Sequence, residues 1–349
     1  MMVKPAVCSV HAPAKINLHL EIKERLPNGF HELQSLFVSL DFGDDLRFET
    51  TEKPGFWELE LRCPPDSPSN LSPELGEFRD NLEVGGLDEF CDNADLAFLD
   101  DFRDNNLITR AVSLFRAKTG FDKGLKCTLD KRIPLGAGLG GGSSDAVSTL
   151  LALDLLAGTK LSIEELLEIA ENMGSDLPFF LHGGAAWVSG RGERIETLIA
   201  PPKYGVILVK PPFQSATGEA YRLLDQYREQ NALKNAGSMP HFATFQPKKP
   251  TPKDVKSAWL LSPETWPFSN DFLDVLPQSD VYNEILQDLR DSGALFAGLS
   301  GSGSCCFGVY KDSETALAAK NALKKSQNKQ FNIFCTFFLA SRAVPVLQL

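Results

Sequence analysis

The chain has 349 residues, of which 43% are hydrophobic, and this is enough apolar material for the cores of two domains. Its net charge of −11 argues against a general affinity for nucleic acid, so no nucleic-acid partner is expected. Its seven cysteines form no Cys-x-x-Cys pair and no uncharged apolar run approaches ~18 residues, so we expect a cytoplasmic protein with reduced thiols and no membrane segment.

The first predicted element is a strand over residues 14–20, Ala-Lys-Ile-Asn-Leu-His-Leu, because apolar and polar residues alternate there. Successive side chains of a strand point to opposite faces. The residues expected to face the core are Ile16, Leu18 and Leu20. The residues expected to share the other face are Lys15, Asn17 and His19. A cation beside an amide usually belongs to a solvated face, and the alternative is a functional site. The residues alone leave both interpretations open.

A turn at Asn28-Gly29 precedes the pair Phe30 and His31. Phe30 offers an aromatic face for stacking, and His31 offers a ring nitrogen for hydrogen bonding, which suits a nucleobase. An ordinary core role for Phe30 is the simpler interpretation. This pair alone does not decide between them.

Residues 64–104 contain about twelve carboxylates, two arginines and several prolines, a composition typical of a solvated insertion. The Asp-x-Asp spacings in it complete no EF-hand loop, so calcium binding is not predicted. Regular structure is expected to resume in a helix over residues 107–118, which Asn106 precedes and Gly120 ends.

The most informative stretch is a glycine-rich loop over residues 134–144, Pro-Leu-Gly-Ala-Gly-Leu-Gly-Gly-Gly-Ser-Ser. It lies between a strand-like run over 125–132 and a helical run over 146–156, and Ser143, Ser144 and Asp145 stand where a helix cap is expected. Glycines let the backbone approach a ligand, and the N–H groups here lie at the positive end of the following helix. The loop therefore predicts a site for an anion, most simply a phosphate.

Other interpretations of this loop fit less well. No Gly-Lys-Ser/Thr ends it, so it is not a Walker A loop. Gly136, Gly138 and Gly141 match the dinucleotide pattern G-x-G-x-x-G, but the ribose-binding acid expected roughly 20 residues later is missing. The partner motifs of a protein kinase are absent. The flanking strand and helix argue against a flexible linker.

A further helix is predicted to begin at the capping box Ser162-Ile163-Glu164-Glu165 and to end at Gly174. Asp176 follows it, just before Pro178. An acid in this position most often caps a helix, and the residues alone give no reason to prefer another role.

Pro201-Pro202 is the best candidate for a domain boundary. It divides the chain into residues 1–200, with the acidic insertion at about 64–104, and residues 201–349, with a polar excursion at about 228–267. The second part is predicted to contain a strand over 205–209, a helix over 281–291 and a glycine turn over 299–304. That turn fits a simple hairpin, and its small residues would also let it close over a phosphate.

Several of these motifs resemble one known family. The pattern P-x-x-x-G-L-G-x-x-S-S-x-A from Pro134 resembles the phosphate loop of the galactokinase, homoserine kinase, mevalonate kinase and phosphomevalonate kinase superfamily. Within it, the loop, Ala-Lys-Ile-Asn-Leu at 14–18 and Gly-Ser-Asp-Leu-Pro-Phe at 174–179 look most like the 4-diphosphocytidyl-2-C-methyl-D-erythritol kinase family. Asn270-Asp271 and the turn 299–304 resemble further segments of it, whereas 64–104 and 228–267 depart from its pattern. The resemblance implies a two-domain α+β fold with the active site in the cleft between the domains.

The resemblance also implies roles for single residues. It makes Lys15 and Asp176 the catalytic pair. The residues implied to bind ATP are Pro134, Leu135, Gly136, Ala137, Gly138, Leu139, Gly140, Gly141, Gly142, Ser143 and Ser144, with Asn106 and Lys131 as further candidates. The residues implied to bind the second substrate are Asn17, Phe30, His31, Thr217 and Tyr221. In the family, the aromatic residue that corresponds to Phe30 is usually tyrosine and stacks on cytosine, and the histidine hydrogen-bonds to the base.

The implied reaction is ATP-dependent phosphorylation of the 2-hydroxyl of 4-diphosphocytidyl-2-C-methyl-D-erythritol, a step of non-mevalonate isoprenoid biosynthesis. Phosphoryl transfer depends mainly on positioning and charge neutralisation, so Asp176 would accept or orient the hydroxyl proton while Lys15 keeps Asp176 ionised. Mg²⁺ is the implied metal, with the hydroxyl of Ser143 or Ser144 as a candidate ligand and no acidic ligand identifiable.

Two alternatives remain from the sequence. One is a sister kinase that acts on homoserine or a mevalonate derivative, which would need no cytosine site. The other is a non-catalytic ligand-binding protein on the same scaffold. The expected partners are ATP and a small cytidylyl substrate, bound by a monomer or weak dimer.

Overall fold

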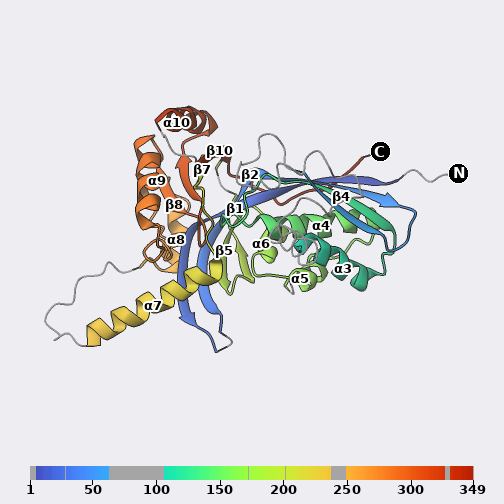
Figure 1. The fold of residues 1–349 in the computed structure, drawn as a ribbon, viewed down its shortest axis with the longest axis horizontal. Helices are drawn as coiled ribbons and strands as arrows, with labels where there is room; N and C mark the ends of the chain where they lie inside the picture. The colour runs from blue at the N-terminus through green and yellow to red at the C-terminus, as the bar shows by residue number, and fades with distance from the viewer. Residues whose placement is uncertain are drawn as a thin grey trace, which may run out of the picture.

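The computed structural model describes residues 5–27, 29–62, 106–171, 173–200, 202–236, 249–326 and 331–348. The acidic insertion predicted at 64–104 lies outside the described residues, and so does part of the polar excursion predicted at 228–267. The described residues form an α+β fold in which helices pack on two β-sheets (Figure 1).

The first sheet has the strand order β11-β1-β2-β4-β3, with β5 paired to β2 and β6 paired to β5. Its strands are β1 (Val7–Arg25), β2 (His31–Thr51), β3 (Trp57–Arg62), β4 (Gly124–Asp130), β5 (Ala185–Gly190), β6 (Arg194–Thr197) and β11 (Val346–Gln348). The second sheet has the order β10-β7-β9-β8. Its strands are β7 (Gly205–Lys210), β8 (Phe296–Leu299), β9 (Cys306–Tyr310) and β10 (Asn332–Phe337). Because β11 pairs with β1, the last described residues return to the first sheet.

The β1–β2 hairpin runs through the length of the molecule (Figure 1). One half of β2 pairs with β4 and the other half with β5, so this hairpin carries both branches of the first sheet. One apolar cluster joins its buried side chains to those of the second sheet, and removal of this surface from water stabilises the contact between the sheets. The cluster includes Ile16, Leu18, Leu36 and Val38 from the hairpin and Val206, Leu208, Phe307 and Val309 from β7 and β9.

Helices of the first half cover the first sheet (Figure 1). They are α3 (Leu107–Thr119), α4 (Gly141–Ala157), α5 (Ile163–Glu171) and α6 (Leu177–His182). The central one is α4, which packs on β1, β2, α3 and α6. Its run from Ser144 to Leu153 is buried without interruption, as expected of a helix surrounded by other elements.

The start of α4 differs from the prediction. The helix begins at Gly141 rather than Ala146, and its N-cap is Gly140 in the left-handed conformation, without a side-chain capping bond. Ser143, Ser144 and Asp145 are therefore not cap residues, and Asp145 instead pairs with the buried Lys131. The prediction was wrong because it assumed that a serine or aspartate side chain caps the helix. In the structure the cap residue is Gly140, which has no side chain to form such a bond.

The second half contributes α7 (Thr217–Ala236), α8 (Pro252–Ala258), α9 (Ser279–Asp291) and α10 (Ser313–Ser326), with a short 3₁₀ turn at Pro263–Thr265. Helices α9 and α10 pack on the second sheet, while α7 lies beside the β1–β2 hairpin (Figure 1). Part of the predicted polar excursion forms α8, whose Val255 is buried with Trp259 in the cluster between the sheets. None of the described helices has the length and apolar character that a membrane crossing needs.

Candidate active site

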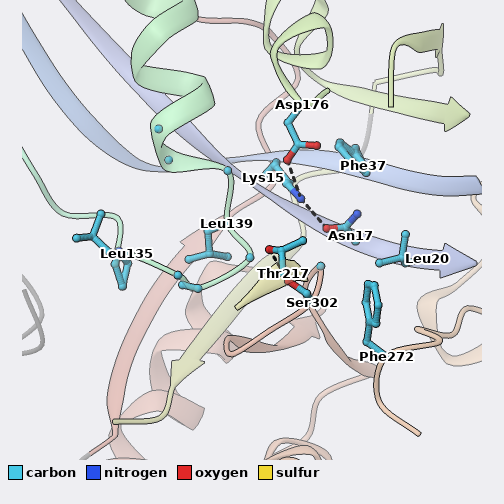
Figure 2. Close-up of a pocket in the computed structure, with 18 of the residues that line it drawn as sticks. Lys15, Asn17, Leu20, Phe37, Leu135, Leu139, Asp176, Thr217, Phe272 and Ser302 are labelled. Carbon is cyan, nitrogen blue, oxygen red and sulfur yellow. Dashed lines mark hydrogen bonds and ion pairs between the residues drawn. The ribbon is translucent and has the colours of Figure 1, made fainter. Parts of the chain in front are cut away.

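A cavity of about 290 Å³ lies where elements from both halves of the chain meet (Figure 2). One wall is the glycine loop, and the opposite wall carries side chains of β1 and β2. The start of α6 and the start of α7 complete it, together with the turn between β8 and β9. Predicted site residues in its lining are Lys15, Asn17, Lys131, Pro134 to Gly142, Asp176, Thr217 and Tyr221.

Lys15 and Asp176 face one another in this cavity (Figure 2). Lys15 Nζ lies 3.4 Å from Asp176 Oδ2, donates to Asn17 Oδ1 at 2.7 Å and lies 4.5 Å from the centre of the Phe37 ring. The Lys15 side chain is 5% exposed, whereas that of Asp176 is 34% exposed. A fixed, buried cation thus stands behind a carboxylate that a substrate can reach, and this arrangement suits a group that accepts or orients a hydroxyl proton.

Asp176 is the N-cap residue of α6, but its side chain makes no capping hydrogen bond. Pro178 stands in the first turn of the helix. Because proline has no N–H group, this turn has one fewer backbone donor that needs an acceptor. The carboxylate is therefore available to Lys15 rather than occupied by the helix. The sequence offered a cap role and, by resemblance, a catalytic role for Asp176. In the structure Asp176 occupies the cap position but makes no capping hydrogen bond.

A β-bulge in β1 changes which side chains reach the cavity. The register with β2 shifts between Asn17 and His19, so His19 packs near Trp187 and Phe268 in the cluster between the sheets. The prediction that His19 shares a face with Lys15 and Asn17 is wrong, because an inserted residue reverses the alternation. Leu20 lines the cavity instead.

Burial lowers the pKa of His19 to about 4, so its ring is neutral in the folded protein. Its Nδ1 accepts a hydrogen bond from the Ser269 N–H at 3.2 Å. His19 is therefore a structural residue of the sheet interface.

The glycine loop presents its backbone to the cavity. Gly136, Gly138 and Gly140 all have positive φ angles, which glycine adopts without strain. A Cβ atom on Gly138 would collide with the carbonyl oxygen of Ser300, and one on Gly140 would press against Phe180 and Lys15. The first N–H groups of α4 have no partner within the helix and lie in this wall of the cavity, which is the arrangement of an anion site.

The turn between β8 and β9 is tied to the glycine loop. Ser300 Oγ donates to the Gly138 carbonyl at 2.9 Å and accepts from the Asn17 N–H at 3.3 Å. Asn270 Nδ2 donates to the carbonyls of Leu299 and Gly301, both at 2.8 Å. The sequence marked this turn and the Asn270 segment by resemblance, but it gave no sign that Ser300 joins β1 to the glycine loop.

Lys131 lies at the edge of the cavity, yet two carboxylates hold its ammonium. It pairs with Asp145 at 2.8 Å and with Asp44, and all three side chains are buried. Burial alone would lower the pKa of Lys131, but the charges of Asp145 and Asp44 outweigh it and raise the pKa. Asp44 also accepts from the N–H groups of Arg132 and Ile133 and so anchors the chain that enters the loop. The predicted role of Lys131 as an ATP contact therefore competes with a structural one.

Asn106 was also predicted to lie near the nucleotide. Its side chain caps α3 by accepting the Ile108 N–H at 2.8 Å, and Asn106 does not line the described cavity. Its predicted role stays untested.

Three of the residues predicted to bind the second substrate lie together at the start of α7. Thr217 Oγ1 lies 3.0 Å from Ser302 Oγ (Figure 2). Tyr221 lines the cavity. His31 stacks on Tyr221 with ring centres 5.0 Å apart, so it lies against a cavity residue without lining the cavity itself. Phe30 is 56% exposed, with the Arg191 guanidinium 5.6 Å from its ring centre. The structure thus groups Thr217, Tyr221 and His31 and leaves Phe30 on the surface.

The start of α4 offers hydroxyl groups as ligands for a metal. Ser144 Oγ, in the first turn of α4, is buried and has no hydrogen-bond partner in the described part of the chain. Among the described residues, no group of three His, Cys, Asp or Glu side chains is arranged to hold a metal. This donor set fits a Mg²⁺ ion held mainly by nucleotide phosphate oxygens and water.

Comparisons with known proteins agree with this geometry. The family model described as the GHMP kinases N terminal domain matches residues 106–184, which include the glycine loop and Asp176. The model described as GHMP kinases C terminal matches residues 269–329. The fold and the site thus define an ATP-dependent small-molecule kinase of the GHMP class.

Individual similar proteins identify a family within this class. A 4-diphosphocytidyl-2-C-methyl-D-erythritol kinase of Synechococcus sp. (strain CC9605) is 34% identical over 326 residues, which cover 90% of this chain and 91% of the relative. One of Pelotomaculum thermopropionicum is 33% identical over 89% of this chain and 91% of the relative. A crystal structure of a 4-(cytidine 5'-diphospho)-2C-methyl-D-erythritol kinase is 27% identical, with a TM-score of 0.66 and coverage of 95% and 98% of the two chains. The chain belongs to the 4-diphosphocytidyl-2-C-methyl-D-erythritol kinase family.

Proposed function

We propose that this kinase transfers the γ-phosphoryl group of ATP to the 2-hydroxyl of 4-diphosphocytidyl-2-C-methyl-D-erythritol, as a step of non-mevalonate isoprenoid biosynthesis. The observation that carries the proposal is the position of Lys15 and Asp176, which face a glycine loop across one cavity. The names of the similar proteins support the choice of acceptor. Tyr221 supplies aromatic surface at one end of the cavity and His31 stacks on it from behind, an arrangement that suits a nucleobase.

In the proposed mechanism, backbone N–H groups of the loop hold the ATP phosphates against the start of α4. Asp176 receives or orients the proton of the attacking hydroxyl, and Lys15, which pairs with Asp176, offsets negative charge that develops on the transferred group. Little covalent chemistry is required of the protein, because positioning and charge stabilisation account for most of the catalysis of phosphoryl transfer.

We infer that Mg²⁺ accompanies ATP. Ser144, and Ser143 beside it, would hold the ion together with phosphate oxygens. When bound, it would neutralise phosphate charge. A cytoplasmic location and a monomer or weak dimer remain expectations from sequence.

The decisive experiment measures ADP release by the wild-type protein with Mg-ATP and each of four acceptors. The acceptors are the diphosphocytidyl compound, its counterpart without the cytidylyl group, mevalonate and homoserine. We expect turnover with the diphosphocytidyl compound only. Turnover with mevalonate or homoserine instead would favour a sister kinase and remove the cytosine assignments. ATP binding without turnover of any acceptor would favour the non-catalytic alternative.

A further inference from the structure

One face of α7 runs from the cavity to the β1–β2 hairpin. Thr217, Tyr221, Asp225 and Arg228 are spaced by four, four and three residues, so they lie along the same side of the helix. Thr217 contacts Ser302 beside the glycine loop, and Arg228 donates to the carbonyls of Ile22 and Lys23 in β1. The helix therefore has a fixed position against the hairpin, as its path beside β1 and β2 indicates (Figure 1).

Between Thr217 and Arg228, two residues of α7 contact His31. Asp225 Oδ1 lies 2.7 Å from His31 Nε2, and the His31 side chain is only 6% exposed. His31 also stacks on Tyr221, whose ring meets Phe272 edge-on with centres 5.0 Å apart. Tyr221 thus contacts the plane of the imidazole and Asp225 contacts its edge, and both residues lie on the same face of α7.

We propose that Asp225 is a positioning residue that fixes the hydrogen-bonding state of His31 and thereby makes this end of the cavity selective for a pyrimidine with an exocyclic amino group. The proposal rests on the proposed function, which brings a cytidylyl substrate to this site. No role for Asp225 follows from the sequence motifs, because it lies outside all of them.

The selectivity follows from the chemistry of the ring. A carboxylate only accepts hydrogen bonds, so Asp225 requires the proton of His31 to be on Nε2. In the neutral ring, Nδ1 then carries the lone pair and can only accept. Cytosine presents an amino donor at position 4, whereas uracil presents a carbonyl acceptor there, so an imidazole fixed in this state can bind the amino group and opposes the carbonyl. Without Asp225 the proton could move to Nδ1, and this distinction would weaken.

The test combines Asp225→Asn with kinetics at pH 8, where an ordinary imidazole is neutral. We expect KM for the cytidylyl substrate to rise about tenfold, with kcat and KM for ATP within about twofold of wild type, because only base binding is affected. The preference for the cytidylyl substrate over its uridylyl counterpart should fall about tenfold. Glu229→Gln is the matched control, since it removes an exposed carboxylate from the same helix, and we expect wild-type constants.

A double-mutant cycle separates positioning from a general structural effect. If Asp225 acts through His31, Asp225→Asn should add no further loss in a His31→Ala background. Nitrogen NMR of the free protein gives a readout independent of turnover: His31 should show the tautomer protonated at Nε2, and Asp225→Asn should change it. Additive losses in the cycle, an unchanged base preference or an unchanged tautomer would overturn the proposal.

Binding of cytidine and uridine diphosphates keeps this test distinct from that of the proposed function. One outcome is that no acceptor is phosphorylated, while the protein binds cytidine diphosphate more tightly than uridine diphosphate and loses this preference in Asp225→Asn. The proposed function then fails, and the inference about Asp225 stands. If the cytidylyl acceptor is phosphorylated and Asp225→Asn behaves as wild type, the function stands and the inference fails.

Discussion

Lys15 Nζ lies 3.4 Å from Asp176 Oδ2, although Lys15 belongs to the first strand and Asp176 begins a helix of a different layer. Asn17 and the Phe37 ring hold the ammonium from the other sides. These contacts fix the position of the ammonium beside the carboxylate. This fixed position is the basis of the first prediction.

We expect Asp176→Asn and Lys15→Ala each to lower kcat by about 10²- to 10⁴-fold while nucleotide still binds, because both residues act on the transferred proton and charge rather than on the nucleotide. Steady-state kinetics and nucleotide titration measure the two effects separately. Lys118→Ala is the control, since Lys118 forms an exposed ion pair with Glu168 and should be neutral for turnover. Normal turnover of Asp176→Asn would contradict the mechanism.

The second prediction concerns two left-handed glycines. Gly138→Ala and Gly158→Ala introduce the same backbone strain, of roughly 1–2 kcal/mol, because the φ angles are 73° and 67°. Only at Gly138 would the new methyl group collide with the Ser300 carbonyl, whereas nothing lies within 4 Å at Gly158. We expect both variants to lose stability, and Gly138→Ala alone to raise KM for ATP about tenfold or more because the loop must move. Equal KM values in the two variants would show that the loop tolerates the displacement.

The third prediction separates the two roles considered for Lys131. If its main role is to neutralise Asp44 and Asp145, Lys131→Met should lower the free energy of unfolding by about 3–5 kcal/mol, because two carboxylates are left buried. Lys126→Met, which removes from β4 an exposed partner of Glu58, should cost less than about 1 kcal/mol. Denaturant unfolding measures both. A rise in KM for ATP without loss of stability would instead make Lys131 a nucleotide contact.

The fourth prediction is a pH dependence of stability from His19. Its folded-state pKa is about 4, below the ordinary value of 6.5, so between these values the unfolded chain binds the proton and the folded protein does not. Its contribution is therefore present above pH 6.5 and is lost as the pH falls toward 4, by about 3 kcal/mol at most. His19→Asn keeps an acceptor for the Ser269 N–H and removes the titration. The difference in unfolding free energy between wild type and variant should shrink over this range, and parallel curves would contradict the assignment.

The sequence by itself determined the local features of the site. Glycines at Gly136, Gly138 and Gly140 are needed for positive φ angles, and the strand before them and the helix after them follow from residue spacing. These are short-range properties, because one residue's backbone conformation or one segment's periodicity decides them. The α+β fold and the kinase class were confirmed, and they too came from local motifs that resemble a family.

The tertiary structure alone decided which polar groups meet. A bulge in β1 turns His19 away from the cavity and brings Leu20 toward it, and no alternation pattern reveals such an inserted residue. The partners that fix the site are distant in the chain, as in the contact of Ser300 with Gly138 and that of Asp225 with His31. Such contacts depend on strand register and helix packing, which arise from burial of the whole apolar surface and not from the pattern of any one segment.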